Sequence, residues 1–348
     1  MLPIDRYLMK KSLEISKQIQ GLKLIYLDTN YWLRLRDELP NKWEQKSEFS
    51  EIVLDLFNAG KCLFPISNIT YYEILKQQDE NSRRNTFEII SKLSSGISLL
   101  NDKERIKIEF AHWMATGQNK VEHAANELVW SKTPTVIAYN EFASIDYSGG
   151  TIDLQDAYFD FMAEMPLSDI TPDASLRQNP FVFKDNVDDF NANKKLYEYQ
   201  NKTYGQLFLS EIGGMLDEAE DLFNQVMQAK FFYDTGRVPT TEEIKNSGKL
   251  CRFTIYNLFK LNKIGTLFPF FQVCADIYSS FRWNKSRIYK DGNDTLDVMH
   301  AAAALPYCDY FFTERELATI ISQRKLGELY NCKVASKQAD VIQLLKKI

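Results

Sequence analysis

The chain has 348 residues, a length that predicts two domains or one elaborated domain with a sizeable core. Its net charge of −5 argues against a protein that coats nucleic acid. Five scattered cysteines without a Cys-x-x-Cys pair argue against a structural zinc site or a disulfide framework and favour a reducing cytoplasm. The N-terminus lacks an uninterrupted apolar segment, and no apolar run approaches the roughly 20 residues of a membrane span. We therefore expect neither a signal peptide nor a membrane helix.

The first buried strand ends in a group of polar residues. Residues 1–21 have the pattern of an amphipathic helix, and the apolar run 24–27 is typical of a buried strand. Asp28, Thr29 and Asn30 follow it directly. In a doubly wound α/β sheet, ligands lie beyond the carboxyl ends of the strands, so Asp28 is a candidate site residue.

Further α/β elements follow along the first part of the chain. Apolar residues recur at helical spacing over 49–57 and stop before Gly60. Residues 61–67 predict a second strand, which leads into a helix carrying Glu73. A short third strand is expected over 96–100.

Between about 101 and 290 the α/β alternation gives way to helical patterns. Helices are expected over 103–114, 121–130 and 204–232, and a further one begins where Thr240 and Glu243 make a capping box. The stretch 141–190 is rich in acids, which predicts a solvated or partner-facing surface. This region is interpreted as an insertion that splits an α/β core.

The α/β pattern returns near the C-terminus. We expect an apolar helix over 266–281, an Ala-rich helix that opens with Asp294 and Asp297, and a strand over 310–313. Helices over 317–324 and 339–348 flank a last strand over 332–336.

The acids recur in an ordered set. Asp28-Thr29-Asn30 follows the first strand, Glu73 lies in the helix after the second, Asp297 heads the Ala-rich helix, and Glu314 comes just past a strand ending at Thr313. This set resembles the PIN domain, a metal-dependent nuclease fold. The resemblance implies a three-layer α/β fold with a parallel sheet in the order 3-2-1-4-5, so that the first and fourth strands are neighbours. We predict a PIN-like core over 1–115 and 266–348, with a helical insertion over 116–265.

Each acid also has a purely structural interpretation, because each lies near the start of a helix. Asp28 could cap a helix beginning at Tyr31, and Glu73 could complete a capping box with Thr70. The macrodipole would favour the other acids in first turns. A helix N-terminus also favours the ionised carboxylate that binds a hard cation, so the two interpretations are compatible.

Two of the four positions required a choice between neighbouring acids. Asp297 is preferred to Asp294 because small residues follow it four and five positions later, as the family has them; Asp294 is a second or alternate ligand. The family usually has Asp at the fourth position, where this chain offers Glu314, with Glu316 as the alternative. The longer Glu side chain puts the metal geometry there in question.

Other polar residues near the acids are assigned more modest roles. His300, alone on an Ala-rich helix, is expected to be packed or hydrogen-bonded more often than to touch substrate. The residues expected to contact nucleic acid are Thr29, Asn30, Arg282, Lys285, Arg287, Lys290 and Arg315.

The resemblance implies a ribonuclease in which Asp28, Glu73, Asp297 and Glu314 bind one or two Mg²⁺ or Mn²⁺ ions that activate water. RNA is favoured over DNA as the target, with 5′-phosphate and 3′-hydroxyl products, and the family includes toxins held by antitoxins. An antitoxin-like regulator fits the same resemblance, and the insertion could mediate the formation of a homo-oligomer. The alternative is an inactive PIN-like scaffold for RNA binding or protein interaction. A dehalogenase-like phosphatase is disfavoured because Asn30 occupies its second Asp position.

Overall fold

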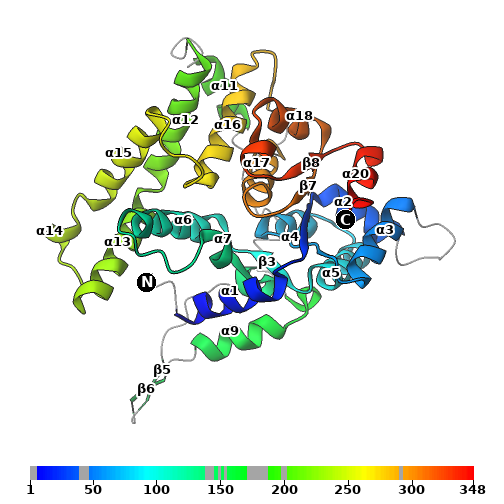
Figure 1. The fold of residues 1–348 in the computed structure, drawn as a ribbon, viewed down its shortest axis with the longest axis horizontal. Coiled ribbons are helices and arrows are strands. Elements are labelled where there is room, and N and C mark those ends of the chain that lie inside the picture. The colour runs from blue at the N-terminus through cyan, green and yellow to red at the C-terminus, as the bar shows by residue number, and fades with distance from the viewer. Residues whose placement is uncertain are drawn as a thin grey trace.

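The computed structural model describes residues 6–38, 47–137, 145–147, 150–152, 155–170, 187–196, 202–289 and 293–348. Its centre is a four-stranded parallel sheet in the order β2-β1-β7-β8 (Figure 1). The strands are β1 (Lys23–Leu27), β2 (Cys62–Leu63), β7 (Tyr310–Phe312) and β8 (Lys333–Ala335). The protein is thus a mixed α/β fold in which strands from both ends of the chain form one sheet.

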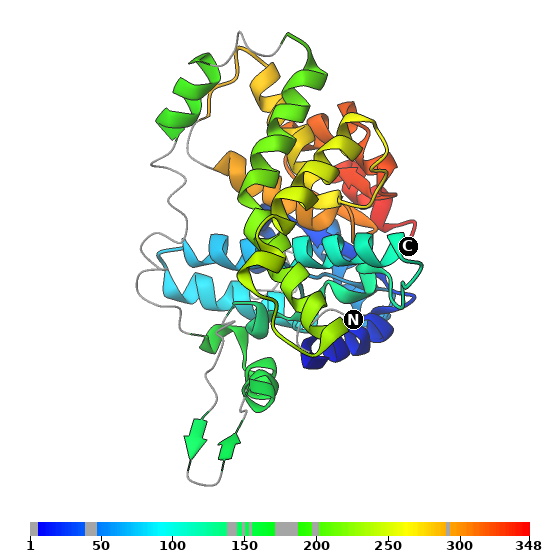
Figure 2. The same cartoon turned by 90° about the vertical axis from the view of Figure 1, so that its left-hand side faces the viewer.

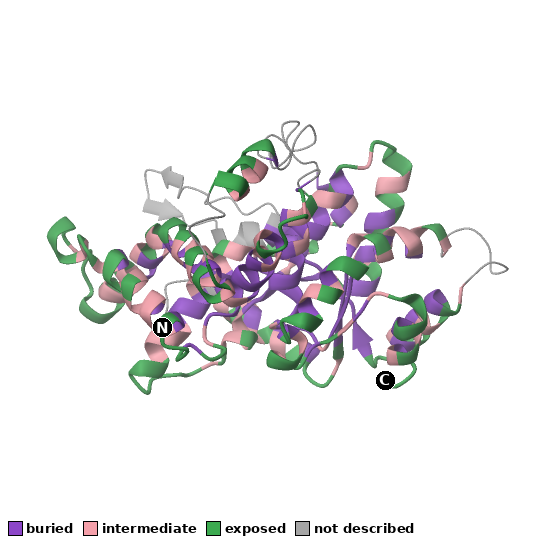
Figure 3. Ribbon diagram, turned by 90° about the horizontal axis from the view of Figure 1, so that it is seen from above, coloured by how far each residue is buried: buried purple, intermediate pink, exposed green. Residues whose placement is uncertain are grey.

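The two faces of the sheet are covered by different helices. Successive side chains of a strand point to opposite faces, so Ile25 and Leu27 join one apolar cluster while Leu24 and Tyr26 join the other. The first face is covered by α2 (Thr29–Glu38), α3 (Glu48–Asn58), α5 (Glu80–Ser94) and α20 (Gln338–Leu345). The second is covered by α6 (Asp102–Gly117), α16 (Pro269–Trp283) and α17 (Asn293–Ala304). Figure 3 shows the buried residues concentrated in the middle of the molecule, where the strands lie.

Strand β1 is enclosed along most of its length. Ile25, Tyr26 and Leu27 have no solvent exposure, and they pair in parallel register with Tyr310, Phe311 and Phe312 of β7. Because both strands run in the same direction, the residues that follow them meet at one edge. The backbone N–H of Asp28 donates to the carbonyl of Phe312 at 3.0 Å, which extends this pairing to the candidate site.

The second strand is shorter than expected, whereas the third forms within the expected residues 96–100. Only Cys62–Leu63 of the expected strand 61–67 pairs with β1, since Pro65 has no N–H to donate to a ladder. The chain beyond it makes a single parallel bridge from Ile66 to Ser98 of β3 (Ile97–Leu99). Strand β3 itself pairs antiparallel with β4 (Trp130–Lys132), a strand that was not expected.

The helical prediction for 121–130 was wrong, because only one turn, α7 (Ala125–Leu128), forms there and Trp130 begins β4. The single helix expected over 204–232 is two helices, α12 (Tyr204–Glu218) and α13 (Glu220–Thr235), which meet at Ala219. At Trp130, pairing with β3 overrode the local helical pattern.

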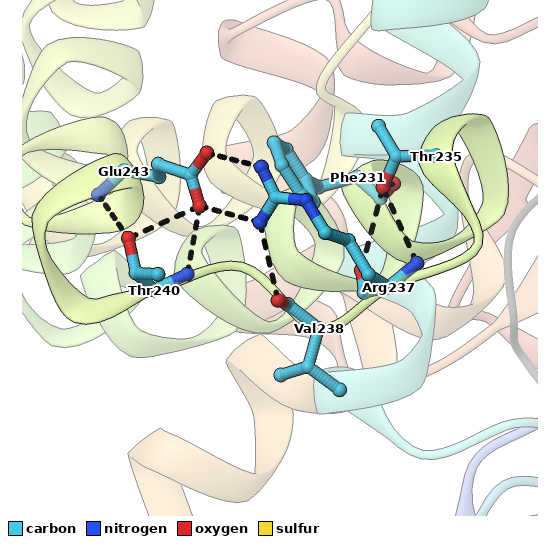
Figure 4. Close-up of polar contacts among 6 residues, drawn as sticks. All are labelled: Phe231, Thr235, Arg237, Val238, Thr240 and Glu243. Carbon is cyan, nitrogen blue, oxygen red and sulfur yellow. Dashed lines mark hydrogen bonds and ion pairs between the residues drawn. The ribbon is translucent and has the colours of Figure 1, made fainter.

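Helices α12 and α13, with α14 (Thr241–Ile244) and α15 (Ser247–Lys260), form an arm that extends from α16 (Figures 1 and 2). The expected capping box is confirmed at α14, where Thr240 accepts from the backbone of Glu243 and the Glu243 carboxylate accepts from Thr240 N at 2.8 Å. Arg237 donates to the same carboxylate and lies 4.7 Å from the ring of Phe231 (Figure 4). The turn between α13 and α14 is therefore fixed by one ion pair and one cap.

The remaining elements connect or flank these layers. They are α1 (Arg6–Ile19), α4 (Asn68–Leu75), α8 (Thr133–Ile137), β5 (Ile145–Tyr147), β6 (Gly150–Ile152), α9 (Gln155–Glu164), a 3₁₀ turn η1 (Leu167–Asp169), α11 (Val187–Leu196), α18 (Arg315–Gln323) and α19 (Leu326–Leu329). Strands β5 and β6 form a hairpin that was not expected. Among the described helices, none combines the length and apolar character that crossing a membrane would require.

Candidate functional site

The site lies where β1 and β7 end. Asp28 follows β1 and is 4 % exposed, and Thr313 follows β7. The hydroxyl of Thr313 donates to Oδ2 of Asp28 at 2.8 Å. Asp28 is therefore a buried acid whose orientation is set by the neighbouring strand.

Glu73 reaches the same edge from the last turn of α4. Its Oε2 accepts from the hydroxyl of Thr29 and makes a hydrogen bond of 2.9 Å with Nε2 of His300. The capping-box interpretation of Glu73 was wrong, because α4 begins at Asn68 with Ser67 as its N-cap, which places Thr70 inside the helix.

His300 is fully enclosed and contributes to the site through both ring nitrogens. Its Nδ1 lies 2.8 Å from the hydroxyl of Tyr26, which in turn lies 2.6 Å from Ser67 Oγ and 3.2 Å from Thr70 Oγ1. A chain of hydrogen bonds thus runs from the core of the sheet through Tyr26 and His300 to Glu73. Its effect is to fix the imidazole, and through it one oxygen of Glu73.

Tyr26 was not predicted as a site residue, and His300 was given only a minor role. Two sequence signals could have found them. Tyr26 lies two residues before Asp28 in a strand, so both face the same side, and His300 lies three residues after Asp297 on a helix, so both share a face.

One oxygen of Asp28, one of Glu73 and one nitrogen of His300 all lie within 4.8 Å of one another. Among the described residues this is the group with metal-ligand geometry. The three residues come from the end of β1, from α4 and from α17, and Glu73 and His300 alone are 227 positions apart in sequence. Folding, rather than a local motif, builds this group.

Asp297 lies close to the group and interacts with it electrostatically. Burial and the charge of Asp28, together with the charges of Glu314 and Glu73, raise the pKa of Asp297 to about 8, although His300 opposes the shift. Burial is the largest cause of this shift, and the charges of the surrounding acids add to it. Asp297 is therefore coupled electrostatically to the acids of the group.

The pKa values of the three grouped residues move in different directions. Burial raises the pKa of Asp28, assisted by the charge of Glu73. Burial alone would also raise the pKa of Glu73, but the charge and hydrogen bond of His300 and the hydroxyl of Thr29 lower it below its ordinary value. Burial opposes protonation of His300, yet Tyr26 and Glu73 raise its pKa well above the ordinary range.

Glu314, the fourth predicted acid, stands at the rim. It is the exposed N-cap residue of α18, and its Oε1 accepts from Nδ2 of Asn30 at 2.6 Å. Its charge acts on Asp297. The structure thus brings Asp28, Glu73 and Asp297 together inside and places Glu314 at the edge.

The two alternate acids face a different partner. Arg287 pairs with Asp294 and with Glu316, and its guanidinium lies 3.9 Å from the ring centroid of Phe281. Neither acid belongs to the group with Asp28 and Glu73. As alternate ligands they stay predictions.

The predicted nucleic-acid contacts are found in several settings. Arg282 pairs with Glu211, Lys285 lies with Arg282 and Arg287 beside a small surface pocket, and Arg315 is exposed at the start of α18. Thr29 and Asn30 hold acids of the site. Lys290 and nearly half of the acid-rich stretch 141–190 lie outside the described residues.

Comparisons of the chain with protein-family models, with curated proteins and with solved structures find no match.

Proposed function

We propose that the protein is a divalent-metal-dependent phosphodiesterase that hydrolyses single-stranded nucleic acid, with RNA favoured over DNA. The observation that carries this proposal is the convergence of three acids, Asp28, Glu73 and Asp297, at the carboxyl edge of a parallel sheet. Ligands bind at this edge in open α/β folds. Helix capping alone does not require carboxylates from different elements to lie together at this edge.

The sheet supports a PIN-like arrangement as part of the proposal. Its order β2-β1-β7-β8, with β3 bridged to Ile66, is compatible with the order 3-2-1-4-5. The strands come from residues before 100 and after 309, which fits a core split by an insertion over 116–265.

The donor set suits Mg²⁺ or Mn²⁺, since hard divalent cations prefer carboxylate oxygens. Asp28, Glu73 and Asp297 would hold the ion, with Glu314 as a ligand at the rim. When bound, such an ion activates water and stabilises the leaving oxygen of a phosphodiester. The raised pKa of Asp297 supports this fit, because a nearby cation would offset the repulsion that keeps its proton on.

The neighbouring residues then have positioning roles. Thr313 and Thr29 donate hydroxyl hydrogens to Asp28 and Glu73, which fixes one oxygen of each and leaves the other for a ligand. The Tyr26–His300 pair fixes Glu73 from the core side. Asn30 orients Glu314 at the entrance.

The second candidate is a PIN-like scaffold that has lost cleavage and serves RNA or protein binding. It is favoured by the pairing of Asp294 and Glu316 with Arg287, which withdraws two acids from the site, and by the exposure of Glu314. Such a scaffold would not cut RNA under any metal condition.

The test incubates end-labelled single-stranded RNA with the protein in Mn²⁺, with and without chelator. We expect cleavage that requires the metal and is lost in Asp28→Asn. Glu242→Gln is the matched control, because it makes the same acid-to-amide change at a side chain that is 84 % exposed on α14. Cleavage that survives chelation, or that persists in Asp28→Asn, would contradict the metal mechanism.

A further inference from the structure

A surface pocket of about 740 Å³ lies next to the acid site. Its walls come from α12, the C-terminal end of α16 and α18, and they include Tyr204, Trp283, Arg287, Arg315, Thr319 and Arg324. Its volume is within the range of ligand pockets, roughly 300–1,000 Å³. None of its aromatic residues was assigned a role by the proposed function.

The start of α18 connects this pocket to the acids. Glu314 bonds to Asn30 at the rim of the acid site, and the next residue, Arg315, lines the pocket. On the other side, Arg287 lines the pocket and pairs with Asp294, which precedes Asp297 by one helical turn. The pocket and the acid site are thus linked through the start of α18 and through the Arg287–Asp294 pair.

The pocket exposes one large aromatic side chain. Trp283, at the last position of α16, is 48 % exposed, and its ring meets that of Tyr204 edge-on with 6.0 Å between centroids. Tyr204 is held from behind, because its hydroxyl donates to the carbonyl of Asp276 at 2.7 Å. The indole is therefore supported on one side and still presents surface to a ligand, as base-stacking aromatics do.

The charges of the pocket are predominantly positive. Its walls carry three arginines and one acid, Glu316. Arg287 is held by acids, and Arg324 is held by Asp276 at 2.8 Å and by the ring of Tyr204 at 4.0 Å, so both serve as walls. Arg315 is exposed, and no ion pair to it is found within the described part of the chain. It is the arginine best placed to receive a phosphate.

We propose that this pocket binds a nucleotide of the single strand next to the phosphodiester that is cut, with its base stacked on Trp283 and its phosphate on Arg315. Stacking on an indole requires an unpaired base, which selects single strands over duplexes. The inference rests on the proposed function for the identity of the neighbouring acid site, but nucleotide binding here does not require that the acids cut.

The experiment measures binding of a fluorescently labelled single-stranded oligouridine by anisotropy, in chelator so that neither metal nor cleavage contributes. Trp283→Ala is compared with Trp283→Phe, and Arg315→Ala with Arg315→Lys. Phe253→Ala is the control, because Phe253 is 64 % exposed on α15, away from the pocket. A second ligand with the same backbone but abasic sugars separates stacking from phosphate binding.

We expect Trp283→Ala to weaken binding about 5- to 100-fold, the range of a lost base–aromatic stack, with Trp283→Phe close to wild type. The abasic ligand should bind wild type weakly and be insensitive to Trp283→Ala. Arg315→Ala should reduce the slope of log affinity against log salt concentration by about 1, the value for one lost phosphate contact, and Arg315→Lys should retain the wild-type slope.

The experiment distinguishes failure of the pocket assignment from failure of the nuclease proposal. Equal affinity of wild type, Trp283→Ala and Arg315→Ala overturns the pocket assignment even if the acids cut RNA. A change in sedimentation of Trp283→Ala without a change in affinity also overturns it and identifies the indole as a contact between copies of the chain. Stacking that holds in a protein unable to cleave in Mn²⁺ supports the pocket and removes only the nuclease.

Discussion

Two acidic sites in this protein can be compared, and they differ in how their charges are balanced. At the end of β1, Asp28, Glu73 and Asp297 share one imidazole, that of His300. At the junction of α6, α16 and α17, a single acid, Glu109, is 1 % exposed. Asp28 and Glu109 are both buried, yet only the first site gathers like charges.

Glu109 has a complete set of partners. The hydroxyl of Tyr307 donates to its Oε1 at 2.8 Å, and the backbone N–H of Phe270, in the first turn of α16, lies 3.3 Å from both oxygens. The nearby Arg105 donates to backbone carbonyls, including Ala302 O at 2.6 Å. Burial raises the pKa of Glu109 to about 7, against the effects of Tyr307 and Arg105.

The difference teaches how to separate a structural acid from a functional one. A single buried carboxylate with every donor in place joins helices and leaves no room for a ligand. A group of acids with too little positive charge is costly to the fold and is retained where a cation completes it. Substitutions at the two groups should therefore have opposite effects on stability and activity.

The largest contrast is expected in activity. Asp28→Asn should lower the RNA cleavage rate in Mn²⁺ by at least about 100-fold, roughly 3 kcal/mol in barrier height, because a principal oxygen donor becomes an amide. Glu109→Gln should leave the rate within about two-fold of wild type. Single-turnover cleavage measures the rates of both variants. Equal losses of rate would contradict the distinction between a functional Asp28 and a structural Glu109.

A contrast in the reverse direction is expected in stability. Glu109→Ala should reduce the free energy of unfolding by about 2–4 kcal/mol, because it leaves the Tyr307 hydroxyl and the Phe270 N–H without an acceptor in the core. Glu109→Gln keeps an acceptor and should lose less. Urea denaturation measures the change, and an alanine variant as stable as wild type would show that Glu109 does not join the helices.

Asp297 should make ion-free stability depend on pH. Its folded pKa of about 8 exceeds its ordinary value of 3.8, so the folded protein retains the proton and loses stability as pH rises between these values. Asp297→Asn should remove that loss. In chelator, the free energy of unfolding of the variant minus that of wild type should be greater at pH 9 than at pH 5 by about 1 kcal/mol or more. Mn²⁺ should raise the melting temperature of wild type but hardly that of the variant. Parallel pH profiles of the two proteins in chelator would contradict the assignment.

The smallest effect is expected at the hydrogen bond behind the site. Tyr26→Phe removes the hydroxyl that contacts His300, Ser67 and Thr70, and should cost about 1 kcal/mol of stability. Cleavage should fall several-fold while Mn²⁺ affinity changes little, because His300 loses its orientation but the carboxylates remain. A loss of activity as deep as that of Asp28→Asn would assign Tyr26 a direct part in the chemistry.

Sequence patterns predicted much of the sheet and the acids, but not how charges pair. Asp28 follows an apolar run and Asp297 opens an Ala-rich helix, and such local signals indicate position in an α/β fold. The contact of Tyr26 with His300 joins residues 274 positions apart, and the pairing of Arg287 with both Asp294 and Glu316 depends on how α17 and α18 pack. Likewise β4 pairs with β3, a partner that its own residues do not indicate.

The central claim is that the acids at the end of β1 bind a hard divalent cation. Calorimetric titration of Mn²⁺ into wild type, Asp28→Asn and Glu109→Gln tests it most directly. We predict saturable binding of one or two ions to wild type and to Glu109→Gln, and a loss of at least about ten-fold in affinity in Asp28→Asn. Absence of saturable binding to wild type, or equal binding to all three proteins, would contradict the account.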